Sequence, residues 1–160
     1  MTGDLTPIEL NINGDVHAIT VETRMSLADA LRDKCSLTGT HLGCEHGVCG
    51  ACTILVDDQP ARSCLMLAVQ AEGHRIRTVE GLSEDGETLH PVQEAFWKHH
   101  GLQCGFCTPG FLMLATSVVE SGRDPSDEEL TEILASNLCR CTGYQNILTA
   151  VRSAIEAARP

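Results

Sequence analysis

Four cysteines in the first half of the chain lie close together in a regular pattern. They are spaced C-x4-C-x2-C, and the fourth cysteine follows after eleven further residues. The four residues are Cys44, Cys49, Cys52 and Cys64. This spacing is the plant-type ligand pattern of a 2Fe–2S cluster, in which thiolates hold both irons. Gly43, Gly47 and Gly50 punctuate the loop, and their uncovered amides can hydrogen-bond to cluster sulfurs.

Other cysteine chemistries fit this stretch less well. A disulfide framework is typical of short secreted chains, and no signal peptide is recognisable at the start of the sequence. Structural zinc sites use paired C-x2-C or Cys/His spacings, and only Cys49 and Cys52 form such a pair here. Residues 44–46 begin like a Rieske C-x-H box, but no downstream C-x2-H completes it. The pattern therefore predicts a 2Fe–2S cluster.

A second group of cysteines lies in the other half, spaced C-x2-C and C-x-C. It consists of Cys104, Cys107, Cys139 and Cys141. Each pair comes just before a predicted helix, whose N-terminal amides and partial positive charge stabilise an anionic centre. On spacing alone both zinc and a second 2Fe–2S cluster remain open. The presence of a first cluster favours a second cluster over zinc, because a further redox centre extends the path for electrons. Cys35 belongs to neither set and is predicted to be a buried free thiol.

Composition narrows the class of protein. The chain has 160 residues and nine cysteines, which suits one or two small domains that bind metal. A net charge of −11 disfavours nucleic acid and anionic membranes as partners. No apolar run reaches the roughly 18 residues of a membrane span. Without a twin-arginine or apolar leader, a cytoplasmic location is expected.

Sequence patterns predict a small mixed sheet in the first half. Residues 8–12 alternate apolar and polar side chains, and Asn13-Gly14 is a strong hairpin turn signal. Ser26 is a candidate cap for a helix. The predicted strands span residues 8–12, 16–21, 53–56, 61–65 and 75–79, with a helix over residues 26–32.

The second half reads as helical, after a polar, glycine-bearing segment over residues 81–87 that is a candidate linker. Pro91 suits a first helical turn, and Ser126 with Glu129 forms a capping box. Thr142 is a candidate cap for the last helix. Predicted helices span residues 91–100, 110–121 and 144–158, and a further helix follows the capping box and contains Leu130, Ile133 and Leu134. Four short helices suggest a bundle. The fold class is therefore α+β.

Three segments together make the chain recognisable: residues 43–52, 103–110 and 138–144. With these motifs the sequence resembles the small iron–sulfur subunit of molybdenum hydroxylases of the xanthine dehydrogenase family. Similar subunits occur in carbon monoxide dehydrogenase, quinoline oxidoreductase and aldehyde oxidoreductase. The resemblance implies an N-terminal β-grasp ferredoxin-like domain over residues 1–80. It also implies a C-terminal four-helix bundle over residues 81–160, each domain holding one 2Fe–2S cluster.

The resemblance also implies partner subunits and a cofactor contact. A large subunit would carry molybdopterin as the cytosine dinucleotide, and a medium subunit would carry FAD, assembled as a dimer of heterotrimers. The cluster of the helical domain would lie nearest the pterin. Gln103 and Cys141 match positions that touch the pterin in this family. The chain itself would contain no catalytic residue, because the substrate is oxidised on the large subunit.

The expected function is therefore electron transfer from molybdenum, through both clusters, to FAD. A free-standing ferredoxin-like carrier is the main alternative, although a carrier needs only one cluster. A structural zinc domain fused to a ferredoxin is another. The substrate stays open among carbon monoxide, aldehydes, purines and N-heterocycles, because its pocket lies on another chain.

The two cysteine sets predict about four irons and four sulfides per chain, measurable by metal and acid-labile sulfide analysis of the intact protein. A Cys35→Ser variant is the control, and both contents should stay unchanged because Cys35 lies outside both sets. Two irons accompanied by zinc would contradict the second cluster. Loss of iron from the control would contradict the assignment of ligands.

Overall fold

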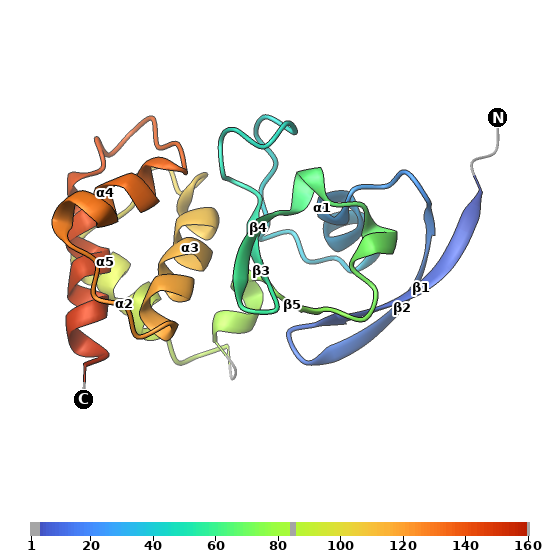
Figure 1. Cartoon of the computed structure of the whole chain (residues 1–160), viewed down its shortest axis with the longest axis horizontal. Helices are drawn as coiled ribbons and strands as arrows, with labels where there is room; N and C mark the ends of the chain where they lie inside the picture. Colours follow the sequence, from blue (N-terminus) through green and yellow to red (C-terminus); the bar gives the residue numbers. More distant parts are fainter. Residues whose placement is uncertain (1–3, 84–85, 160) are drawn as a thin grey trace.

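The computed structural model describes residues 4–83 and 86–159. Within them, a five-stranded sheet in the first half lies beside four longer helices of the second half (Figure 1). The strands are β1 (Leu5–Ile12), β2 (Asp15–Glu22), β3 (Thr53–Val56), β4 (Gln59–Arg62) and β5 (Arg75–Arg77). The helices are α1 (Leu27–Asp29), α2 (Pro91–Lys98), α3 (Thr108–Glu120), α4 (Asp127–Ala135) and α5 (Gln145–Ala157). The predicted mixed α and β content is confirmed.

The sheet is mixed, with strand order β2-β1-β5-β3-β4. Strands β1 and β5 are parallel and the other neighbours are antiparallel. The predicted β1–β2 hairpin is confirmed, and Asn13 and Gly14 at its turn have φ values of 55° and 93°. Such a turn needs positive φ at both central residues, which Asn and Gly tolerate. Short β5 therefore sits between the hairpin and the β3–β4 pair.

The predicted helix over residues 26–32 is only partly α-helical. Ser26 accepts a hydrogen bond from the Asp29 amide, so the predicted cap is confirmed. After Asp29 the backbone widens into a π-helical segment, Ala30–Lys34, in which the Cys35 amide donates to the Ala30 carbonyl at 3.1 Å. Leu27 and Leu31 are fully buried in the core of the sheet half.

Strand β3 contributes to two separate cores. Ile54 belongs to the core of the sheet half, whereas Leu55 packs with the helices, and both are fully buried. This division follows because successive strand residues point to opposite faces. Helix α3 packs directly against β3 and β4. The second half therefore covers one face of the sheet's β3–β4 end.

The helical half largely follows the prediction. The Ser126–Glu129 capping box is present, and α2 packs against α5, with Phe96 of α2 and Phe111 of α3 in the shared core. The predicted cap at Thr142 is wrong: the last helix starts at Gln145, and Tyr144 precedes it in the left-handed conformation with φ 68°. No helix in residues 4–83 and 86–159 combines the length and the apolar character that crossing a membrane requires.

Other predicted boundaries shift by a few residues. Strand β4 ends at Arg62, and the turn Ser63–Leu65 is a 3-10 helix rather than the end of a strand. Helix α2 stops at Lys98, two residues before the predicted end. Of the predicted linker, residues 81 and 82 end a 3-10 turn, and residues 84 and 85 lie outside the described residues.

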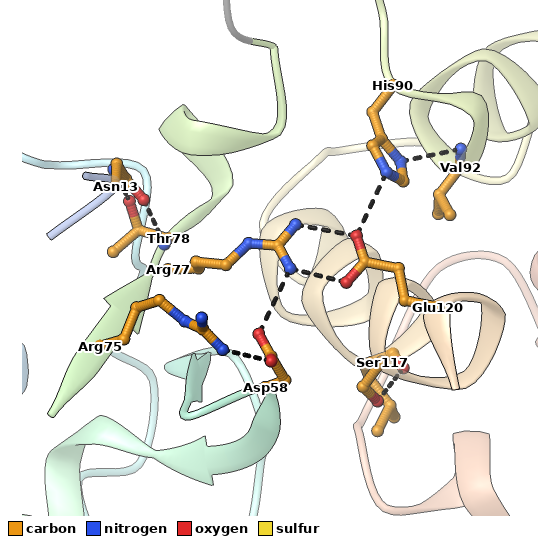
Figure 2. Close-up of polar contacts among 10 residues, drawn as sticks. Asn13, Asp58, Arg75, Arg77, Thr78, His90, Val92, Ser117 and Glu120 are labelled. Atoms are coloured by element: carbon orange, nitrogen blue, oxygen red, sulfur yellow. Dashed lines mark hydrogen bonds and ion pairs between the residues drawn. The ribbon is translucent and has the colours of Figure 1, made fainter. Parts of the chain in front are cut away.

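An ion pair joins the two halves at the edge formed by the β3–β4 turn (Figure 2). The Arg77 guanidinium on β5 donates to both carboxylate oxygens of Glu120 on α3, at 2.6 and 2.9 Å. Asp58 lies 3.7 Å from the same guanidinium, and His90 lies 3.7 Å from Glu120. The Arg77 hydrogen bond lowers the pKa of the Glu120 carboxyl, so the pair is ionised at neutral pH.

A double-mutant cycle of Arg77→Ala and Glu120→Ala should give a coupling free energy of about 1 kcal/mol or less. The value is small because both side chains remain partly in water, which screens exposed ion pairs. Urea unfolding of the cluster-loaded chain at pH 7 measures it. Strictly additive single substitutions would show that the pair does not help to hold the two halves together.

Candidate metal centres

The first cysteine set surrounds the start of the β3–β4 pair. Residues 43–52 form a loop that leads into β3, and the Cys49 amide donates to the Cys44 sulfur at 3.3 Å. Because Thr53 pairs with Arg62, the turn after β4 returns beside the start of β3. There the Ser63 hydroxyl donates to the Cys52 carbonyl at 2.8 Å, which places Cys64 beside Cys52. The structure thus brings the four cysteines of this set together.

The thiols of this set influence one another's protonation. Amide hydrogen bonds from Cys49 and His46 lower the pKa of the Cys44 thiol to about 6. Burial raises the pKa of Cys64 to about 11, and a hydrogen bond with Cys52 adds to the shift. The Cys64 thiol therefore keeps its proton at neutral pH. Iron bound at this set would displace that proton, since the thiolate is the ligand form.

The second set gathers where two loops meet at one end of the helices. Cys104 and Cys107 precede α3, and Cys139 and Cys141 lie between α4 and α5. The sulfurs of Cys141 and Cys104 are 3.5 Å apart. Burial raises the pKa of the Cys107 thiol to about 12, and a hydrogen bond with Cys139 adds to the shift. The predicted second set therefore also converges, as two sulfur pairs.

Cys139 has additional hydrogen bonds that the sequence analysis did not foresee. Its sulfur accepts from the Thr142 hydroxyl at 3.1 Å and from the Thr142 amide at 3.4 Å. Burial alone would raise the pKa of the Cys139 thiol, but these hydrogen bonds lower it below its ordinary value. Thr142 therefore supports a cysteine in place of the helix cap that was predicted for it.

The two cysteine loops touch directly, on the upper edge of the molecule in Figure 1. The Leu138 amide donates to the Cys49 carbonyl at 2.8 Å. Leu138 directly precedes Cys139 of the second set, and Cys49 belongs to the first set. Buried Asn137 donates to the Gly50 carbonyl at 3.2 Å. Arg62 extends from β4 and donates to the Ser136 carbonyl at 2.6 Å.

His41 and Phe106 join the first set's loop to the other loop of the second set, which carries Cys104 and Cys107. Their rings stack with centroids 5.0 Å apart, and the His41 Nδ1 lies 2.8 Å from the Phe106 carbonyl oxygen. His41 lies three residues before Cys44, and Phe106 lies between the two cysteines of the C-x2-C pair. The loop of the first set is thus held to both loops of the second set.

Gly110, in the first turn of α3, allows this close approach. A Cβ at this position would lie well inside van der Waals contact with the Gly50 carbonyl, and 3.2 Å from the Ala51 carbonyl. These neighbours are backbone atoms and cannot rotate away. Only glycine therefore lets α3 pack directly on the first cysteine loop.

The remaining predicted site residues occupy different surroundings. Gln103, Cys104 and Cys141 are exposed, on the outer side of the second set. Cys35 was predicted to be a buried thiol, but it is only half-buried; it packs against the sheet core, and burial raises its pKa. Within the described ranges, no three His, Cys, Asp or Glu side chains converge closely enough for a single metal ion.

Known families match both halves of the chain. A model described as a 2Fe-2S iron-sulfur cluster binding domain matches residues 10–81, and one described as a 2Fe-2S binding domain matches residues 78–152. The caffeine dehydrogenase subunit gamma of Pseudomonas sp. (strain CBB1) is 58% identical over 149 residues, covering 91% of this chain and 89% of the relative. The chain belongs to the small iron–sulfur subunits of molybdenum hydroxylases.

Further matches agree with this membership. The nicotine 6-hydroxylase small subunit of Paenarthrobacter nicotinovorans is 56% identical, covering 94% of this chain and 90% of the relative. The crystal structure of quinoline 2-oxidoreductase from Pseudomonas putida 86 superposes with a TM-score of 0.91 at 54% identity, covering 96% of each chain. This small iron–sulfur subunit serves electron transfer, and catalysis takes place on other subunits. The resemblance inferred from the sequence is confirmed.

Gly110→Ala should disrupt the packing of α3 on the loop of residues 43–52, because the added methyl group collides with the Gly50 carbonyl. We expect a loss of stability of at least about 2 kcal/mol, in the range of overpacked cores, measured by urea unfolding. Gly122→Ala is the matched control at the other end of α3. Its Cβ would meet open space, so only its positive φ costs stability. Equal losses in both variants would contradict the close-approach explanation.

Proposed function

We propose that this small subunit conducts electrons from the molybdenum centre of a large subunit to FAD on a medium subunit. Cys104, Cys107, Cys139 and Cys141 hold the cluster that is reduced first. Cys44, Cys49, Cys52 and Cys64 hold the cluster that delivers electrons to FAD. When bound, a 2Fe–2S cluster takes up and releases one electron at a time. The chain separates the two electrons that substrate oxidation releases together.

The hydrogen bond between Leu138 and Cys49 carries this proposal. Leu138 is bonded directly to Cys139, so a route of covalent bonds and one hydrogen bond links a ligand of each set. Asn137 and Arg62 hold the same two loops in register. A free electron carrier has no need for a fixed second site, whereas a conducting subunit requires a constant distance between its two centres.

The exposed side of the second set supports a contact with the pterin through Gln103 and Cys141. A glutamine that only capped the backbone of a buried loop would be covered, but Gln103 is exposed beside exposed Cys104. Its amide can both donate and accept hydrogen bonds, as the polar edge of a pterin requires. Cys141 would serve both the cluster and the cofactor surface.

The remaining expectations complete the proposal. Residues 1–80 form a β-grasp ferredoxin-like domain and residues 81–160 a four-helix bundle, in agreement with the sheet order and with helices α2 to α5. The partners bind molybdopterin cytosine dinucleotide and FAD, and assemble with this chain as a cytoplasmic dimer of heterotrimers. Relatives named for caffeine and nicotine support an N-heterocycle as the substrate of the whole enzyme.

Rapid reduction of the assembled complex by an N-heterocyclic substrate tests the function. Cluster absorbance should bleach before the flavin is reduced. Gln103→Ala should leave iron content unchanged but slow this bleaching or lower molybdenum occupancy. Losing one hydrogen bond costs roughly 1–3 kcal/mol, so we expect a partial defect of about tenfold.

Gln59→Ala is the matched control. Gln59 is an exposed glutamine that pairs with Val56, at the end of the β3–β4 hairpin away from Cys52 and Cys64. Cluster bleaching and molybdenum occupancy in this variant should equal those of the unaltered complex. Unchanged bleaching and unchanged molybdenum occupancy in Gln103→Ala would reject its contact with the pterin. Flavin reduction without any bleaching would reject the conducting role of the chain.

A further inference from the structure

The sulfur of Cys139 receives a hydroxyl hydrogen bond in addition to an amide hydrogen bond. Thr142, half-buried in the loop before α5, supplies both, at 3.1 Å from its Oγ1 and 3.4 Å from its backbone nitrogen. The loop containing these residues turns back on itself at Gly143, where φ is 64°. The threonine side chain therefore faces the cysteine and not the helix that follows.

The direction of the Thr142 hydroxyl is set by its neighbours. The Tyr144 amide donates to the Thr142 Oγ1 at 3.1 Å. A hydroxyl has a single proton, so accepting this amide leaves that proton available for the Cys139 sulfur. The arrangement does not depend on a freely rotating hydroxyl.

Tyr144 is itself anchored at both ends. Its phenol oxygen accepts a hydrogen bond from the Cys139 amide at 3.1 Å, and its ring packs edge-on against Phe111 with centroids 6.2 Å apart. Its backbone has a positive φ of 68°, which is uncommon for a residue with a bulky side chain. Cys139, Thr142 and Tyr144 therefore form a closed ring of hydrogen bonds around one proposed ligand.

We propose that Thr142 tunes the helical-half cluster, raising its reduction potential through the hydroxyl hydrogen bond to the Cys139 sulfur. The inference rests on the proposed ligand set. Reduction adds negative charge, and a hydrogen bond to a thiolate stabilises the more negative state more strongly.

Thr142→Val in the assembled complex tests this role. Removal of the donor should lower the equilibrium constant for reduction of this cluster by about tenfold, equivalent to about 59 mV for a one-electron couple. A potentiometric titration followed by EPR resolves the two clusters, and the potential of the other cluster should stay unchanged. Thr142→Ser retains the hydroxyl and should restore the original potential.

Thr149→Val is the matched control, because that hydroxyl on α5 donates to the Gln145 carbonyl and not to a sulfur. It should leave both potentials unchanged. Iron and sulfide are measured in every variant. A missing cluster would contradict the proposed ligand set, whereas an intact cluster with an unchanged potential in Thr142→Val would contradict the tuning. An exchangeable proton coupled to the helical-half cluster should also appear by ENDOR in the unaltered complex. Its absence would overturn the proposal even if Thr142→Val does not assemble.

Discussion

The hydrogen bond from the Leu138 amide to the Cys49 carbonyl is the contact on which the arrangement of the two halves depends. It joins loops that are far apart in the sequence, so closing them costs chain entropy. Asn137, Arg62 and Gly110 help to meet this cost at the same place, by hydrogen bonds and by close backbone packing. Each cysteine loop is shaped partly by the other, and neither half presents its sulfurs independently.

Helix α3 connects this contact between the cysteine loops to the opposite edge of the molecule. Its first turn lies against Gly50, and its last residue, Glu120, is paired with Arg77 on β5 at the opposite edge. Buried Leu55 of β3 packs with the helical core between these two ends. Contacts at both ends of α3 and along its side therefore hold the helix against the sheet, and they set the separation of the two cysteine sets.

Much of this organisation could be predicted from the sequence, because its signals are local. The Asn13-Gly14 turn and the Ser126–Glu129 capping box each act within a few residues, and the structure contains both. The cysteine spacings also grouped side chains that the fold brings together, although their role as ligands stays a prediction. Recognition of the three motifs supplied the family, which the comparisons confirm.

The contacts between the cysteine loops of the two halves could not be predicted, because they are made largely by backbone groups. The Cys49 carbonyl and the Leu138 amide have no side-chain signature, and the contact between Gly110 and Gly50 depends on how two halves pack. Thr142 was misread because a threonine before a helix usually caps it. The positive φ of Tyr144 and the nearby sulfur instead gave its hydroxyl a different partner.

The unequal burial of the cysteines has a consequence for how the holoprotein is made. Cys52 is only 2% exposed beneath the loop that the helical half clamps, whereas Cys104 and Cys141 lie on the surface. A scaffold protein that delivers preformed clusters can reach the second set after the chain has folded, until a partner subunit covers it. In the first set only Cys52 is buried, whereas Cys44, Cys49 and Cys64 are half-buried. In the folded chain the sulfur of Cys52 is therefore the least accessible of the eight proposed ligands.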